Sequence, residues 1–196
     1  MARVGDQKVA QPRISPCWFV FSLLLIAACA DPAERASGVL EIRIKDHREA
    51  IEDFAKLDLS IESVALSRRA TLKFWTIGWQ DFAPQTGTID LTRYTGGKSA
   101  SIVRAMVGAA AFDAIHLKLN RVQGVLKKDR SVTAVKNLIT PVKLAFEVLP
   151  QGETIVVLDL VVMDLSDHPP RSYELSVRGY ELYTNGKLVD KIPPGP

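Results

Sequence analysis

The feature that most constrains the fold is an alternation of apolar and polar residues with a period of two, which begins at Gly38. In the first such segment, Leu40, Ile42 and Ile44 alternate with charged residues. This pattern is typical of a strand with one buried face and one solvated face. It returns in residues 57–66, 75–79, 115–119, 142–148 and 173–177. Because no helix-length pattern separates these segments, we predict an all-β domain, a sandwich or a barrel, and favour an antiparallel β-sandwich.

Two segments predict finer features of the fold. The apolar set changes phase between Ile61 and Val64, and a β-bulge near Glu62-Ser63 would return both sets to one face. The segment Thr154–Met163 is apolar on nearly every residue, which is typical of a central strand covered on both faces. We therefore expect a bulged strand early in the domain and a central strand late in it.

Two local signals lie outside the plain strands. Asn185-Gly186 falls inside the segment Tyr180–Ile192 and is the strongest short signal for a tight hairpin, because both turn residues must adopt positive φ. The segment His47–Ala55 is the one candidate for a helical turn, in which Ile51 and either Phe54 or Ala55 would face inward.

The N-terminus has the organisation of an export signal. Arg3, Lys8 and Arg13 give residues 1–16 a positive charge, and residues 17–28 are almost entirely apolar and end in small side chains. This apolar run of about a dozen residues is shorter than the roughly 20 that a membrane-spanning helix needs. We therefore predict a cleaved signal peptide over residues 1–28.

The junction Ile26-Ala27-Ala28-Cys29 resembles the lipobox of bacterial lipoproteins, in which an aliphatic residue and two small residues precede a cysteine. The resemblance implies cleavage between Ala28 and Cys29 and transfer of a diacylglycerol to the sulfur of Cys29. Two or three acyl chains, such as palmitate, anchor a protein stably, at about 0.8 kcal/mol per buried CH₂. Because Ala rather than Asp follows Cys29, the resemblance favours the outer membrane where the organism has one.

The residues around Cys29 allow a second interpretation of the cleavage site. Ala28-Cys29-Ala30 also satisfies the small-x-small rule for ordinary secretion, with cleavage before Asp31. In that case Cys29 would be removed and the product would be freely soluble. Cys17 lies in the apolar leader and is lost in either case, so no internal disulfide is expected in the mature protein.

The remaining chain divides into a tether at residues 29–37, a β-sandwich domain at 38–192 and a tail at 193–196. The residues from 30 to 37 are polar and span at most about 28 Å, so the domain would lie near the lipid surface. Residues 1–28 hold three of the 25 basic and one of the 22 acidic side chains, which leaves the mature chain nearly neutral. A nearly neutral domain lacks the basic footprint of a nucleic-acid-binding protein.

The domain also resembles an uncharacterised domain-of-unknown-function family of bacterial envelope lipoproteins, which is placed among transthyretin-like or immunoglobulin-like sandwiches. The resemblance spans most of residues 38–180 and departs from the family pattern at Gly108–Ala111. It implies a fold and a location, and it implies no reaction. The matching segments are 38–46, 88–91, 112–119 and 158–160.

Acidic residues are the first candidates for a binding site. Calcium prefers several oxygen ligands from loops, and four aspartates after strands or inside the central strand offer such ligands, although no calcium-loop motif is present. Asp159 is notable because a carboxylate in an apolar strand must be paired or turned outward. The candidate cation ligands are Asp46, Asp159, Asp164 and Asp167.

Trp75 and Trp79 are a second candidate, as an aromatic platform for a sugar or peptide, although tryptophans at alternate positions of a strand more often belong to the core.

The remaining motifs favour structural rather than functional interpretations. Gly96–Ser99 lacks the first glycine of a phosphate-binding loop and indicates a turn. Lys127–Arg130 indicates a solvated hairpin tip. The histidines, including His116 on a polar strand face, have no metal-ligand spacing.

No nucleophile motif occurs, and Cys29 is assigned to lipid, so catalysis has no candidate residues. We predict a non-enzymatic binding or structural module without cofactor or metal, held to the membrane by the lipid on Cys29, with an unknown envelope protein or ligand as partner. The alternative is a carrier of a small ligand, carbohydrate or calcium ion in a loop cleft. An envelope hydrolase is a remote alternative.

Overall fold

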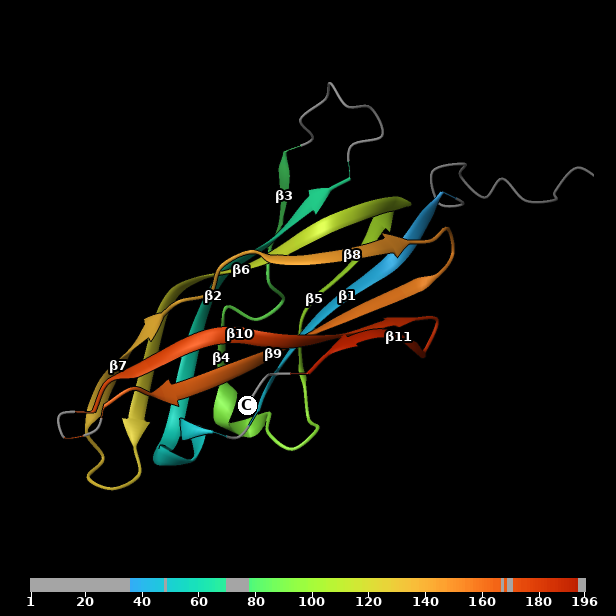
Figure 1. Ribbon diagram of the computed structural model, residues 1–196. Coiled ribbons are helices and arrows are strands. Elements are labelled where there is room, and N and C mark those ends of the chain that lie inside the picture. The colour runs from blue at the N-terminus through green and yellow to red at the C-terminus, as the bar shows by residue number, and fades with distance from the viewer. Residues whose placement is uncertain (1–35, 48, 70–77, 167, 169–170, 194–196) are drawn as a thin grey trace, which may run out of the picture. The chain divides into compact units, whose positions relative to one another are not determined.

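The described part of the chain consists of strands and short turns. The computed structural model describes residues 36–47, 49–69, 78–166, 168 and 171–193, all of which belong to the unit Pro32–Pro196. Within these residues the structure is all-β, which confirms the predicted class (Figure 1). The strands are β1 (Ser37–Asp46), β2 (Phe54–Arg68), β3 (Trp79–Phe82), β4 (Thr88–Asp90), β5 (Ala100–Gly108), β6 (Ala110–Leu126), β7 (Val132–Asn137), β8 (Val142–Val148), β9 (Glu153–Asp164), β10 (Tyr173–Thr184) and β11 (Lys187–Ile192), with the 3-10 helices η2 (Ala50–Asp53) and η3 (Leu91–Arg93).

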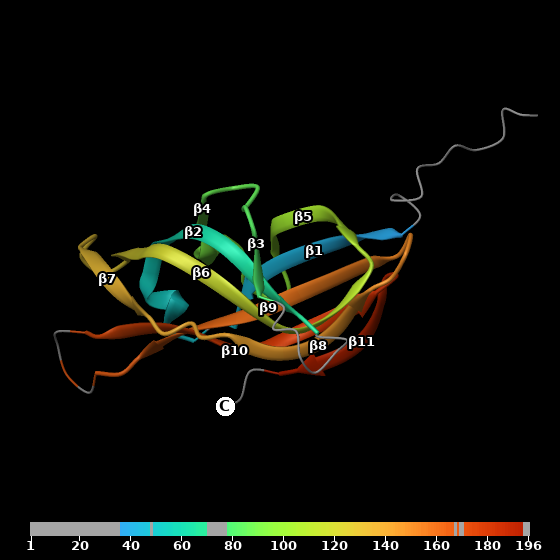
Figure 2. The same ribbon diagram turned by 90° about the horizontal axis from the view of Figure 1, so that it is seen from above.

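These strands form one continuous hydrogen-bonded sheet in the order β3-β2-β6-β7-β10-β9-β1-β5. The remaining strands β4, β8 and β11 pair with β2, β6 and β10. The short strand β7 joins the two halves, because Val132 pairs with β6 whereas Val135 pairs with β10. Seen from above, the sheet curls back over itself around the core, which brings the domain close to a barrel (Figure 2).

The sheet is mixed, so the prediction of a purely antiparallel sandwich is wrong. β1 runs parallel to β9, and β7 runs parallel to β10. The other strand pairs are antiparallel. A parallel pair needs a long crossover, and here most of the domain's sequence separates β1 from β9. Alternation in a sequence tells which face a residue occupies, and it carries no information about the direction of the neighbouring strand.

The core is filled by the apolar residues that the alternation selects. Leu40, Ile42 and Ile44 of β1 are fully buried, and so are the apolar residues of β2 on both sides of its irregularity. The register of β2 against β6 shifts between Ile61 and Ser63, which confirms the predicted bulge. β9 lies between β10 and β1 and is buried along its middle, which confirms the predicted central strand.

The hairpin and the helical turn are also confirmed. Asn185 and Gly186 have φ of 49° and 75° and connect β10 to β11. The predicted helical turn is the 3-10 helix η2, where Ile51 and the following Phe54 are 3% and 1% exposed. Gly124 of β6 leaves room for Phe54, because a Cβ at this position would lie 2.2 Å from the Phe54 ring.

β1 connects two ends of the domain. Its ten residues span about 33 Å. At its start, the carbonyl of Ala36 accepts a hydrogen bond from the Ala109 N–H. The carboxyl end of β1 leads into η2, and we call this side of the domain the loop end. Among the described residues, no helix has the length and hydropathy that crossing a membrane requires.

Candidate functional site

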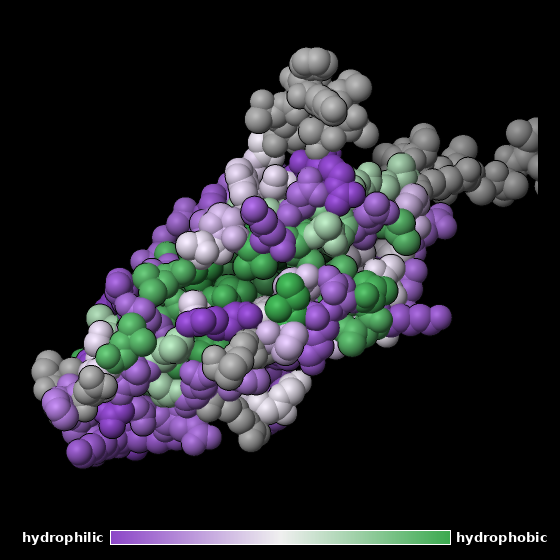
Figure 3. Space-filling model, viewed as in Figure 1, coloured by the Kyte–Doolittle hydropathy of each residue, from purple (hydrophilic) through white to green (hydrophobic). Residues whose placement is uncertain are grey.

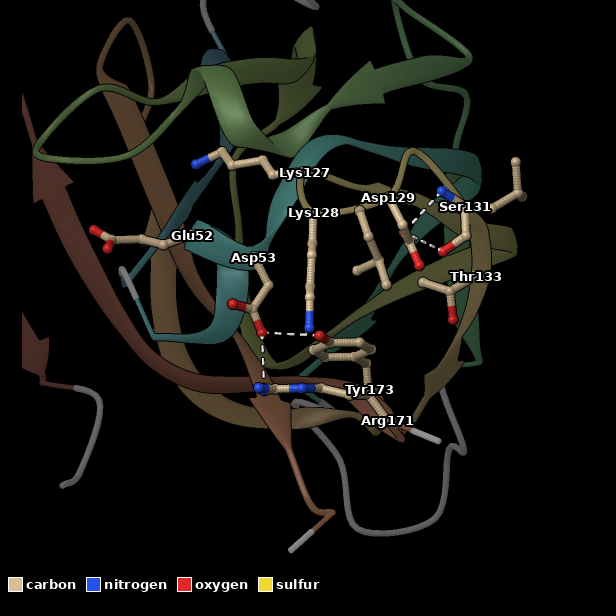
Figure 4. Close-up of a pocket in the computed structure, with 11 residues that line it drawn as sticks. Glu52, Asp53, Lys127, Lys128, Asp129, Ser131, Thr133, Arg171 and Tyr173 are labelled. Atoms are coloured by element: carbon tan, nitrogen blue, oxygen red, sulfur yellow. Dashed lines mark hydrogen bonds and ion pairs between the residues drawn. The ribbon is translucent and has the colours of Figure 1, made fainter. Parts of the chain in front are cut away.

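A cavity of the described domain opens at the loop end. It has a volume of about 580 Å³, within the usual size range of small-molecule sites. Its walls come from η2, the turn between β6 and β7, and the start of β10 (Figure 4). We call it the loop-end cleft; it is lined by Glu52, Asp53, Leu126, Lys127, Lys128, Asp129, Ser131, Val132, Thr133, Arg171 and Tyr173.

A fixed turn carries the two lysines of the cleft. The Leu126 N–H donates to the Ser131 carbonyl at 3.0 Å, and the Asp129 carboxylate accepts from the N–H and the hydroxyl of Ser131. Arg130 completes the turn with a φ of 59°. The predicted hairpin tip is therefore confirmed. The sequence did not show that this tip forms one wall of a cleft.

The opposite wall is held by a chain of hydrogen bonds that converges on one carboxylate. Asp53 Oδ2 accepts from the Tyr173 hydroxyl at 2.8 Å and from Arg171 Nη1 at 3.2 Å. The same Arg171 nitrogen also forms an ion pair with Asp164 at the end of β9. Burial and the hydrogen bond to Asp53 raise the pKa of Tyr173 to about 12, so the phenol keeps its proton at neutral pH.

The two walls are tied together by backbone and ring contacts. The Lys127 N–H donates to the Asp53 carbonyl at 2.8 Å. Beneath the cleft, the rings of Phe54 and Tyr173 meet edge to face with centroids 4.7 Å apart. These contacts connect the β6–β7 turn to η2 and to β10, so the cleft is preorganised by its own scaffold.

A second cavity adjoins the first. It measures about 590 Å³ and shares Glu52 and Lys127 with the loop-end cleft. Thr92 and Thr95, from the segment around η3, contribute hydroxyl groups to its lining, and Phe54 contributes an apolar surface. Lys127 therefore stands between two adjoining cavities at the loop end.

Of the described candidate cation ligands, Asp46 and Asp159 line one pocket and Asp164 does not. Lys45 forms an ion pair with Asp159 at 3.2 Å, so Asp159 is paired, as expected for a carboxylate in an apolar strand. Asp164 instead binds Ser166 and Arg171, and these bonds, that of Ser166 first, lower its pKa. Asp167 lies outside the described residues.

A pocket of about 350 Å³ lies beside Asp159 and is also lined by Lys45 and His47. The ammonium of Lys45 already neutralises Asp159 there, which disfavours a cation. In the described ranges, no group of three or more His, Cys, Asp or Glu side chains is arranged to hold a metal ion. The turn at Gly96 and Gly97, both with positive φ, borders this pocket and is a turn, as predicted.

Of the two candidate tryptophans, the structure describes Trp79 and not Trp75. Trp79, at the start of the edge strand β3, is 46% exposed, so assigning it to the core is wrong. A four-residue edge strand offers too little cover for so large a ring. Trp79 instead rests edge to face on His116 of β6, with centroids 6.3 Å apart. Trp75 lies outside the described residues, as do Ala28 and Cys29.

The charged face of β1 is a further polar region, formed by the outward side chains of β1 and its neighbours. Lys45 binds Glu181 at 3.0 Å as well as Asp159, and Lys191 binds Glu181 at 2.8 Å. Burial opposes ionisation of Glu181, but hydrogen bonds from Lys191, Tyr183 and Lys45 outweigh it and lower its pKa to about 2. Toward the start of β1, Glu41 binds Arg43 and Arg104, and Arg104 also binds Glu153.

The fold and the cleft together define an all-β domain with a preorganised cavity at its loop end. In the family comparison, the model of the family described as Domain of unknown function (DUF4382) matches residues 37–175. The chain belongs to this family, as the sequence resemblance to a domain-of-unknown-function family implied. No curated protein and no solved structure matches the chain.

Proposed function

We propose that this protein is a lipid-anchored module of the bacterial envelope that binds a small ligand in the loop-end cleft and does not transform it. The anchor would be the acylated Cys29, and the membrane would be the outer one where two are present. The lipobox-like junction after the export signal supports this address. The volume of the cleft and its hydrogen-bonded walls support the binding role.

The position of the cleft is the observation that carries the binding role. The described chain starts at Ala36, which lies at the start of β1, only seven residues after Cys29. The cleft lies beyond the other end of this strand, which is itself about 33 Å long. The cleft therefore lies at the opposite end of β1 from the point where the described chain begins.

The chemistry of the cleft supports binding without catalysis. Its hydroxyl groups are not activated: Ser131 donates its proton to Asp129, and the pKa of Tyr173 is raised. Neither histidine nor cysteine is among the described residues that line it. The carboxylate beside Ser131 is a weak base, because the hydrogen bonds from Ser131 lower the pKa of Asp129.

The anchor is tested by labelling the full chain in a Gram-negative host that is fed an alkyne-bearing palmitate. The wild type should carry the label and fractionate with the membrane. Cys29→Ser should lose the label, because the sulfur is the acceptor, and should leave the membrane or stay unprocessed. The matched control is Cys17→Ser in the leader, which should label normally. A mature N-terminus at Asp31 without acyl chains would contradict the anchor.

A further inference from the structure

Within the loop-end cleft, the acidic and basic side chains differ in whether they already have partners. Asp53 accepts from Tyr173 and Arg171, and Asp129 accepts from Ser131. In contrast, neither Lys127 nor Lys128 forms an ion pair or a side-chain hydrogen bond with a described residue. The cleft therefore presents two lysine ammonium groups that form no ion pair with its carboxylates, although the charge of Lys128 contributes to lowering the pKa of Asp129.

The direction of the lysines adds to this difference. Figure 4 shows the Lys128 side chain extending toward the group formed by Tyr173, Asp53 and Arg171, whereas Glu52 points away from this group. Arg171 uses a single nitrogen for its two ion pairs, so the rest of its guanidinium remains available as a donor. Lys128 and Arg171 thus bring positive charge from two walls toward one region.

The cleft also has an apolar part. Leu126 and Val132 line it beside the Tyr173 ring, and Val132 is 63% exposed although it lies next to this cavity. Small-molecule sites commonly combine an apolar lining with a few placed polar groups that fix orientation. An occupant with an apolar body would cover Val132 while its charged group meets the lysines.

We propose that the cleft recognises an oxyanion, a carboxylate or a phosphate group, carried on a small apolar body. Lys128 is the principal partner of the oxyanion, Arg171 assists it, and Lys127 borders the site toward the adjoining cavity. Charge-assisted hydrogen bonds are about twice as strong as neutral ones, so the anionic group would determine selectivity. This inference rests on the proposed binding role of the cleft and specifies its ligand class.

The test uses the lipidated full chain in phosphatidylcholine nanodiscs and isothermal titration with three probes, with empty nanodiscs as the blank. Benzoate and phenyl phosphate share an aromatic body and differ in the oxyanion, whereas benzamide is a neutral match for benzoate. We expect at least one anion to bind about tenfold or more tightly than benzamide. Whether benzoate or phenyl phosphate binds more tightly assigns the anion as carboxylate or phosphate.

Two variants make the test specific. Lys128→Gln should weaken binding of the anion by about tenfold or more and leave benzamide unaffected. Lys143→Gln, which removes an exposed lysine from β8, should bind as the wild type does. Equal affinity for benzoate, phenyl phosphate and benzamide would overturn the inference and leave a neutral ligand in the proposed cleft. Undiminished anion binding by Lys128→Gln, or no binding of any probe, would also overturn it.

Discussion

The charged face of β1 and the loop-end cleft hold similar residue types and arrange them in opposite ways. On the charged face, each acid has a basic partner and some acids have two. Two of these acids, Glu41 and Asp159, are only 3% exposed. In the cleft, Lys127 and Lys128 are exposed and form no ion pair with a described residue.

This difference teaches how the two regions contribute to the molecule. A buried charge that loses its partner is strongly destabilising, so removing a partner from the charged face should lower the stability of the domain. An exposed lysine without a partner contributes little to folding. Its charge remains available to a ligand. We therefore assign stability to the charged face and binding to the cleft.

The largest expected difference in stability is between two lysine substitutions, one on the charged face and one in the cleft. Lys45→Met should lower the free energy of unfolding by about 4 kcal/mol, because the buried Asp159 would lose its ion-pair partner and the partly exposed Glu181 would keep only Lys191. Lys128→Met should change it by less than about 0.5 kcal/mol. Urea denaturation of both variants measures the contrast. Similar losses in the two variants would remove the basis for separating the two regions.

A second effect concerns pH. The pKa of Glu181 is lowered to about 2 in the folded state, from an ordinary value of 4.5. Its contribution to stability is therefore complete above about pH 4.5 and is lost as the pH falls from there toward 2. We expect a loss of roughly 3 kcal/mol at most over this window, since Glu181 is partly exposed.

The measurement is the unfolding free energy at several values of pH between 2 and 6. Glu181→Gln removes the titrating group, so its stability should decline less steeply with acid than that of the wild type. The matched control, Glu52→Gln at the rim of the cleft, should retain the wild-type slope. An unchanged slope in Glu181→Gln would show that the charged face does not control acid stability.

The sequence predicted the local structure well, because local structure depends on neighbours along the chain. The bulge beside Glu62, the turn at Asn185-Gly186 and the pairing of Asp159 each follow from the residue types within a few positions. The same reasoning placed Trp79 in the core, because alternation cannot distinguish a short edge strand from an interior one.

The strand order and the cleft were beyond such reasoning. β1 pairs with β9, and β7 with β10, only after distant segments have come together. For the same reason, Lys127-Lys128 has the sequence of a plain solvated tip, and nothing near it in the chain indicates a cavity. The fold places Asp53 of η2 and Tyr173 of β10 against this tip, although both are distant from it in sequence.

The smallest of the three effects is directed at the cleft and should leave the charged face intact. In Gly124→Ala the new Cβ would lie 2.2 Å from the buried Phe54 ring, and the ring would have to move. We expect a loss of about 2 kcal/mol in the free energy of unfolding, which is typical of overpacking. Because the Phe54 ring packs against the Tyr173 ring, binding of the anionic probe should weaken in parallel, while the acid dependence due to Glu181 should persist.

Gly108→Ala on β5, where the nearest atom would be 3.8 Å away, serves as the control and should behave as the wild type. If Gly124→Ala kept wild-type stability and binding, the packing around Phe54 would accommodate the added methyl group. The preorganisation of the cleft would then not depend on the packing of Phe54.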